Sequence, residues 1–438
     1  MGPMLSTQTG LNEVQEVLPG FCEEAFAQHR TLHRYWDPVR IARAAPFRSF
    51  PSAATKLHDV TLSCVQAWGT TSGRIALGLS GGLDSSILLG CLREMPSNSD
   101  VVCFTHFAEG PDSDERQFAR LVAERAKCRH IELSRHSDVD LRTVLSQVRL
   151  ERSPGMRTSQ IDRIEPDLAL DAGAGAIFKG HGGDELFCRH HTQFYLADLL
   201  RSQGPSAEFL GQLTHSAVTE GENLWRSLFR ALHHAFVPYR WDVTAILRGD
   251  QEDQSLLHPE VVRSVLADGS FELPFVSSTR GCSPGKLWQI TLITGRRRYY
   301  GPWDRDGDPQ SISPLLSQPI IETCLRIPTF MQMRQRRERA VAREAFNREV
   351  PREVLERRWK GGTEQLAWKL LQRNLPFVRE LLLDGVLARR GLVDRPKLEA
   401  ALSGGPSSLV RATVPLFELI GMEAWLYAWS GRGVRSMQ

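Results

Sequence analysis

A glycine-rich loop joins an apolar segment to an apolar helical pattern early in this chain. Residues 75–79 read Ile-Ala-Leu-Gly-Leu, which is typical of a buried strand, and residues 80–86 read Ser-Gly-Gly-Leu-Asp-Ser-Ser. Glycines allow backbone N–H groups to converge on an anion, and the N-terminus of the helix that follows adds its positive dipole. This strand–loop–helix unit therefore predicts a phosphate-binding loop at the edge of a parallel sheet.

The residues of this first loop exclude two common nucleotide-binding motifs. The loop has no lysine after its last glycine, as a Walker A loop requires, and it lacks the G-x-G-x-x-G spacing of a dinucleotide fold. The hydroxyls of Ser80, Ser85 and Ser86 can donate to phosphate oxygens, whereas Asp84 would repel a bare phosphate. An acid at this position favours a Mg²⁺ ion that bridges its carboxylate and the phosphates.

Short apolar strands alternate with helical patterns in the first half of the chain. Further strands are expected at residues 101–105, 130–133 and 174–178. Such alternation predicts an α/β fold, with a parallel sheet covered by helices on both faces. From about Leu196 onward the pattern is mainly helical, interrupted by a Pro/Gly/Asp-rich loop over residues 301–314.

These patterns predict three parts of the chain. Residues 1–48 are expected to be a lead-in segment, residues 49–195 an α/β core, and residues 196–438 a mainly helical lobe that completes the same unit. The total length is sufficient for two to three domain-sized units with a sizeable core.

A second glycine-rich loop follows the strand expected at residues 174–178. It reads Gly-His-Gly-Gly-Asp-Glu-Leu-Phe over residues 180–187. Because parallel strands present their carboxyl ends at one edge of a sheet, this loop is expected to face the first one. Asp84 and Asp184 would then be ligands of a single Mg²⁺, with Gly180 beside the nucleotide.

The charge balance, the hydropathy and the cysteines indicate a cytoplasmic protein that is not built for nucleic acid. The 54 basic and 51 acidic residues nearly balance, which argues against a protein built for nucleic acid. No apolar run approaches the roughly 18 residues of a membrane span, and the N-terminus lacks the features of a signal peptide. The eight cysteines are scattered without metal-binding spacing, as in a reduced cytoplasmic protein.

The two loops together resemble known enzymes. The first loop is similar to the S-G-G-x-D-S signature of the N-type ATP pyrophosphatases, and the second to the G-x-G-x-D-E-x-F stretch of the asparagine synthetase family within that group. Residues 313–319 and the Arg-Arg-Trp-Lys-Gly segment at 357–361 extend this resemblance, which covers about residues 50–430. It implies that ATP is a co-substrate with Mg²⁺, and that a carboxylate is adenylated with release of pyrophosphate before an amine attacks.

The resemblance also implies which residues contact ATP. They are Leu79, Ser80, Gly81, Gly82, Asp84, Ser85, Ser86, Phe104, Thr105 and Gly180.

Several positions depart from asparagine synthetases. Residue 2 is Gly where that family carries its glutaminase cysteine, so no ammonia from glutamine is expected. His181 stands where asparagine synthetases have Glu and β-lactam synthetases have Tyr. The Glu that pairs with this Tyr falls near Gln310, and Asp304, Asp306 and Asp308 are the nearby acids that can replace it.

These departures are most similar to lasso peptide cyclases. That resemblance implies a precursor peptide as substrate, whose N-terminal amine closes an isopeptide ring on an Asp or Glu side chain. It also implies a leader peptidase or a leader-binding protein as a partner. An asparagine or β-lactam synthetase-like ligase that uses ammonia or a small amine stays open, as does an ATP-binding subunit with weak or no catalysis.

Three side chains are candidates for the chemistry. His181 can take the proton of the attacking amine because histidine titrates near neutrality. Lys360, one of only seven lysines, matches the family lysine that stabilises the developing charge. Arg339 stands where the family often has a phosphate-contacting lysine, although residues 334–339 also fit a charged helical face. Lys179, just before the second loop, is a further candidate to reach phosphate.

Overall fold

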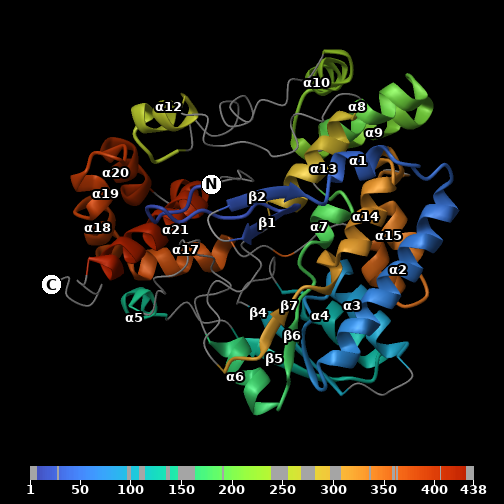
Figure 1. Ribbon diagram of the computed structural model, residues 1–438, viewed down its shortest axis with the longest axis horizontal. Coiled ribbons are helices and arrows are strands. Elements are labelled where there is room, and N and C mark those ends of the chain that lie inside the picture. The colour runs from blue at the N-terminus through green and yellow to red at the C-terminus, as the bar shows by residue number, and fades with distance from the viewer. Residues whose placement is uncertain are drawn as a thin grey trace.

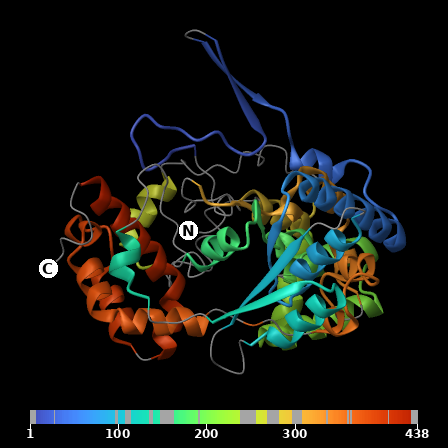
Figure 2. The same ribbon diagram turned by 90° about the horizontal axis from the view of Figure 1, so that it is seen from below.

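The computed structural model describes residues 7–26, 29–95, 100–107, 114–134, 139–146, 163–189, 192–237, 255–267, 282–295, 307–334, 337–357, 361, 364–404 and 406–430. An α/β body lies on one side of the molecule and a group of C-terminal helices on the other (Figure 1). Figure 2 shows a β-hairpin that projects away from the α/β body. None of the described helices is long and apolar enough to cross a membrane.

Five parallel strands form the central sheet, in the order β5–β4–β3–β6–β7. Their bounds are Ile75–Gly78 for β3, Val101–Phe107 for β4, Arg129–Ser134 for β5, Ala176–Phe178 for β6 and Gln310–Ile312 for β7. The first four occupy the segments predicted from the sequence. Strand β7 lies in a segment predicted to be a loop, and that prediction was wrong because three residues are too few to show a strand period. Pairing with β6 fixes β7 at the edge of the sheet.

Helices cover both faces of the sheet, so the predicted α/β class is confirmed. Ile75, Leu77 and Phe178 point to one face, where they share a core with α2, α3, α4, α14 and α15. Ala76 and Ile177 point to the other face, which α6 covers. The bounds are Phe50–Thr71 for α2, Leu83–Arg93 for α3, Arg116–Arg125 for α4, Ile164–Asp171 for α6, Gln318–Arg326 for α14 and Ala340–Ala345 for α15.

The remainder of the chain is mainly helical, as predicted. Beside the α/β body lie α7 (Gly183–Leu186), α8 (Thr192–Gln203), α9 (Ala207–Glu220), α10 (Leu224–Phe236), α13 (Pro284–Thr294), α16 (Arg352–Glu356) and the 3₁₀ turns η4 (Pro314–Leu316) and η5 (Thr329–Gln332).

The C-terminal helices have a hydrophobic core of their own. This group comprises α17 (Glu364–Arg373), α18 (Leu375–Leu383), α19 (Val386–Arg389), α20 (Arg395–Ser403) and α21 (Pro406–Trp429), with α5 (Leu141–Leu145) and α12 (Pro259–Ala267) beside them. Leu371, Leu381 and Ile420 are fully buried at its centre.

The N-terminal segment contains the projecting hairpin and one short helix. Strands β1 (Phe21–Phe26) and β2 (His29–Arg34) pair antiparallel and are largely exposed. Helix α1 (Pro38–Arg43) begins at Asp37, whose carboxylate accepts hydrogen bonds from two backbone N–H groups of its first turn. The three predicted parts of the chain stay a prediction, and the sheet takes its last strand from the third of them.

Candidate active site

The first loop turns sharply from β3 into α3. Gly81 has a φ of +68°, and a Cβ atom there would lie 2.8 Å from the backbone N of Ala119, so only glycine fits. Ser80 Oγ lies 3.2 Å from Ser85 Oγ, and the Ser86 hydroxyl donates to the carbonyl of Gly82 at 2.8 Å. The loop therefore places two hydroxyls together at the N-terminus of an eleven-residue helix, as a phosphate cradle requires.

The second loop packs directly on the first. A Cβ atom on Gly180 would lie 2.8 Å from the backbone N of Ser85, and one on Gly183 would lie 2.3 Å from Cγ of Asp84. Gly182 between them has a φ of +92°, a backbone conformation that favours glycine. The absence of side chains at these positions thus lets the loops touch, and their predicted approach is confirmed.

Arg339 contacts both of the aspartates that are predicted from the sequence to bind Mg²⁺. Its Nη1 atom lies 3.3 Å from Oδ1 of Asp84 and 3.3 Å from Oδ1 of Asp184. Burial alone would lower the pKa of Arg339, but the nearby negative charges outweigh burial and raise it. The site therefore holds two carboxylates around one permanently charged guanidinium.

The backbone holds Arg339 in an unusual conformation. Its φ is +56°, in the left-handed region, and it directly precedes α15. Such a conformation costs about 1–3 kcal/mol in a non-glycine residue and is typical of functional sites. The alternative reading of Arg339 as part of an exposed helical face is wrong, because the side chain is buried at the two loops.

Two further charged side chains surround this group. Arg189 lies 3.2 Å from Asp184 and 3.7 Å from Glu338, and Glu338 lies 3.7 Å from Arg339. Burial raises the pKa of Glu338. This ring of alternating charges fixes the position of Asp184 relative to Arg339.

Three of the residues predicted to contact ATP lie in or directly after β3 and β4. Leu79, Phe104 and Thr105 are all buried. The Leu79 N–H donates to the Phe104 carbonyl at 2.8 Å, and the Thr105 hydroxyl donates to the Leu79 carbonyl. Their side chains are therefore packed into the body of the protein.

Lys360 lies outside the described residues. The nearest described residues on either side of it, Arg357 and Gly361, contact one carboxylate. Glu115 accepts hydrogen bonds from Arg357 Nη2 and, at 2.9 Å, from the backbone N–H of Gly361. Arg357 also donates to the Gly81 carbonyl at 3.2 Å. Both ends of the segment at 357–361 are thus fastened to Glu115, and Arg357 is also fastened to the first loop.

The remaining candidate residues lie in the second loop, just before it, or in the segment that leads into β7. His181 is half-buried in the second loop, and its role as a base stays a prediction. Lys179 pairs with Glu165 at 2.6 Å. Asp308 pairs with Arg163 at 2.8 Å, whereas Asp304 and Asp306 lie outside the described residues.

Two groups at the site were missed in the sequence. One is Glu115, whose partners Arg357 and Gly361 lie 242 and 246 positions away in the sequence. The other is the contact of His106 with Glu165, at 2.9 Å. A histidine two residues after Phe104 was a signal for the latter, but nothing in the sequence marks Glu165 as its partner.

In a comparison with known protein families, the chain matches the model of one family. The asparagine synthase family model matches residues 56–272 and 310–427, which is more than half of the chain. The chain is also 21% identical over 348 residues to the "Microcin J25-processing protein McjC" of Escherichia coli. That alignment covers 78% of this chain and 58% of the length of the Escherichia coli protein.

Proposed function

Because the chain belongs to the asparagine synthase family, we propose that it is an ATP-dependent amide ligase that adenylates a carboxylate and joins it to an amine. Within this chemistry we propose a lasso peptide cyclase, in which both groups belong to one precursor peptide. The name of the Escherichia coli relative, a microcin J25-processing protein, supports a peptide substrate. The observation that carries the proposal is the packing of the two glycine-rich loops, which brings Asp84 and Asp184 to one guanidinium nitrogen.

The donor set at the loops fits Mg²⁺. This ion takes one or two carboxylates and completes its shell with water and substrate phosphates. Asp84 and Asp184 provide two such carboxylates, and among the described residues no group of three or more His, Cys, Asp or Glu is placed to hold a metal. A bound Mg²⁺ would neutralise phosphate charge at the first loop.

In the first half of the proposed reaction, a carboxylate oxygen attacks the α-phosphorus of ATP and pyrophosphate leaves. Catalysis of this step is mainly positioning and charge stabilisation. Ser80 and Ser85 would hold phosphate oxygens, and Arg339 would shift from the aspartates to the phosphates. Lys360, on the segment fastened to the first loop, would stabilise charge as the bond to pyrophosphate breaks.

In the second half, the amine attacks the acyl-adenylate and AMP leaves. An ammonium group has no lone pair, so a base must accept its proton. His181 is the candidate base that the sequence provides. We propose that a leader peptidase or leader-binding protein supplies the processed peptide.

The test supplies the protein with ATP, Mg²⁺ and synthetic peptides that have a free N-terminal amine and one Asp or Glu side chain. We expect AMP and pyrophosphate to form together with a peptide lighter by one water. N-terminally acetylated peptides should give no ring. Formation of asparagine from aspartate and ammonia, with no peptide product, would replace the cyclase by the small-amine ligase, and formation of ADP in place of AMP would contradict the adenylation step.

A further inference from the structure

Three titratable side chains meet at the carboxyl edge of the sheet, outside the group formed by the two aspartates and Arg339. His106 lies near the end of β4, Lys179 directly follows β6, and Glu165 lies in the first turn of α6. Glu165 Oε1 is 2.9 Å from His106 Nε2, and Glu165 Oε2 is 2.6 Å from Lys179 Nζ. One carboxylate thus links the two strands that flank β3.

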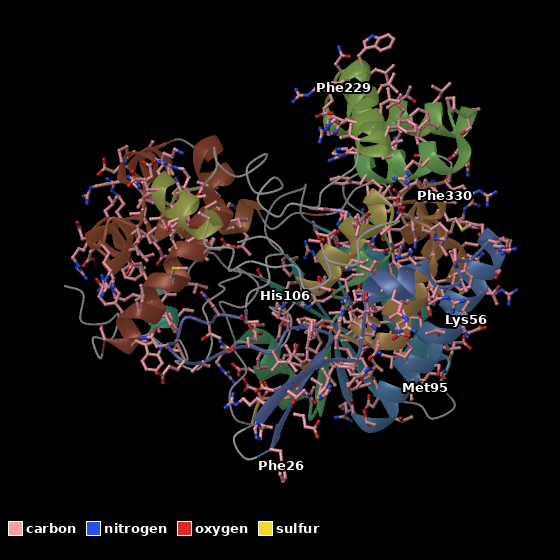
Figure 3. The ribbon with its side chains drawn as sticks, turned by 45° about the horizontal axis from the view of Figure 1, so that its top comes forward. Phe26, Lys56, Met95, His106, Phe229 and Phe330 are labelled. Atoms are coloured by element: carbon pink, nitrogen blue, oxygen red, sulfur yellow. The ribbon has the colours of Figure 1, made fainter. Side chains whose placement is uncertain are left out.

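Strand register places His106 beside the first loop. Gly78 of β3 is in register with Phe104 of β4, so His106 lies at the level of Ser80, where the loop begins. The His106 ring also meets the Phe104 ring edge-on, with 5.7 Å between centroids. Ligands of parallel sheets bind outside the carboxyl ends of the strands, which is where this histidine lies. Figure 3 labels His106 near the middle of the molecule, between the α/β body and the C-terminal helices.

The element that carries Glu165 is itself fixed to this edge. Arg163, immediately before α6, contacts Asp308 at 2.8 Å in the segment that leads into β7. Only 5% of the Asp308 side chain is exposed. The start of α6 is therefore held to three strands, which fixes the position of the Glu165 carboxylate.

These contacts determine which nitrogen of His106 carries hydrogen. Burial would raise the pKa of Glu165, but the hydrogen bond from His106 and the charge of Lys179 outweigh it, so the pKa lies well below its usual range. An ionised carboxylate only accepts hydrogen bonds, so Nε2 of His106 must carry the hydrogen. Nδ1 of neutral His106 then carries the lone pair, and this buried atom has no hydrogen-bond partner among the described residues.

We propose that His106 is the general base that accepts the proton of the attacking amine, and that Glu165 and Lys179 are positioning residues for it. This assignment rests on the proposed amide-ligase function and makes His106, rather than His181, the proton acceptor. The amine nitrogen forms a bond to the acyl carbon as the bond from that carbon to the AMP oxygen breaks. The amine proton passes to Nδ1, Glu165 neutralises the resulting imidazolium, and the proton later leaves to solvent.

The test separates the two halves of the reaction in the His106→Gln variant. Glutamine keeps an N–H donor for Glu165 but has no basic nitrogen. With an N-terminally acetylated peptide, we expect pyrophosphate exchange into ATP to stay within about twofold of the native rate, because adenylation needs no amine. Ring closure of the free peptide should fall on the order of 10²-fold or more, the usual contribution of a general base.

A second readout uses hydroxylamine, which is unprotonated at neutral pH and needs no protein base. His106→Gln should still form hydroxamate from the adenylated peptide at nearly the native rate. In His106→Ala, added imidazole should restore part of the ring closure, which a purely structural role would not allow. Glu165→Gln should lower ring closure but not pyrophosphate exchange.

His58→Gln is the matched control, since His58 also contacts a carboxylate, with 3.0 Å between its Nε2 and Glu349 Oε1. This variant should leave both half-reactions unchanged.

Unchanged ring closure in His106→Gln would overturn the assignment while the ligase function stood. A loss of ring closure in His181→Gln alone would assign the base to His181 instead. A raised KM for ATP in pyrophosphate exchange would instead show that His106 contacts the nucleotide. Absence of AMP from the native protein with every peptide would refute the proposed function itself.

Discussion

Two groups of buried charged side chains in this molecule are built in opposite ways. The active-site cluster, which consists of Asp84, Asp184 and Arg339, places two carboxylates on one guanidinium nitrogen. The helix-junction cluster, which consists of Asp198 of α8 and Lys286 of α13, surrounds each charge with neutral partners. Each cluster contains buried charges, and only Asp184 is half-buried, so burial alone does not distinguish a functional charge from a structural one.

Asp198 accepts hydrogen bonds from three donors. The donors are the Ser283 hydroxyl at 2.6 Å, the Gly285 N–H at 3.1 Å and the Thr329 hydroxyl. Burial raises the pKa of Asp198, although these hydrogen bonds act in the opposite direction. One carboxylate therefore joins α8, the start of α13 and η5.

Lys286 has a complete set of acceptors. Its Nζ atom donates to Gln289 Oε1 at 2.6 Å, to the Ile327 carbonyl at 2.6 Å and to the Cys324 carbonyl at 3.2 Å. A buried polar group satisfied by the fold itself stabilises that fold. In the active-site cluster, by contrast, two carboxylates are held together and share one guanidinium, an arrangement typical of functional sites.

The largest effect should come from Asp84→Asn. Pyrophosphate exchange should fall on the order of 10²–10³-fold, because one of two carboxylates for the metal is lost. The free energy of unfolding should change by less than about 1 kcal/mol, since the substitution also removes a like-charge contact. Exchange assays and urea unfolding measure both quantities. Asp184→Asn should behave in the same way, and normal exchange in either variant would contradict the function of the cluster.

The second largest effect should fall on stability and leave activity nearly unchanged. Asp198→Ala leaves three buried donors without an acceptor and should lower the free energy of unfolding by about 2–4 kcal/mol. Asp198→Asn retains an acceptor oxygen and should lose less. Activity per folded molecule, measured below the unfolding transition, should stay within about twofold of native. A large loss of activity in a folded Asp198 variant would place this carboxylate in the chemistry.

The sequence predicted the active-site cluster better than the helix-junction cluster for a physical reason. The two loops are local motifs, and their meeting follows from the geometry of a parallel sheet, so Asp84 and Asp184 could be paired without coordinates. The position of Arg339 came only from resemblance, and its left-handed backbone has no sequence signal.

Contacts between distant elements were not predictable. Asp198 and Lys286 lie in apolar helices where a charged residue gives no indication of its partners. Glu165 reaches His106 only because α6 packs on the sheet face formed by β3, β4 and β6, and β7 is too short to show a pattern. In each case the sequence does not show the tertiary arrangement that brings the second residue of the pair into contact with the first.

A smaller effect is expected from Lys286→Met. Methionine fills much of the same volume, but the carbonyl of Ile327 and the amide oxygen of Gln289 lose a donor, so the free energy of unfolding should fall by about 1–3 kcal/mol. Urea unfolding measures the loss, and pyrophosphate exchange should remain native. Because lysines are few in this chain, a loss of exchange would be informative: it would show that Lys286 serves the reaction as well as the fold.

The smallest effect tests a partly exposed pair, His58 of α2 with Glu349. Burial lowers the pKa of His58, but hydrogen bonds and charge from Glu349 and Asp59 outweigh burial and raise it above 6.5. A raised histidine pKa stabilises the fold fully below about pH 6.5, and this stabilisation disappears as the pH rises through the value in the folded protein. His58→Gln should therefore cost less than about 1 kcal/mol at pH 6 and nearly nothing at pH 9. Urea unfolding of native and variant protein at both pH values checks this, and an equal cost at both would show that packing of His58, rather than its charge, stabilises α2.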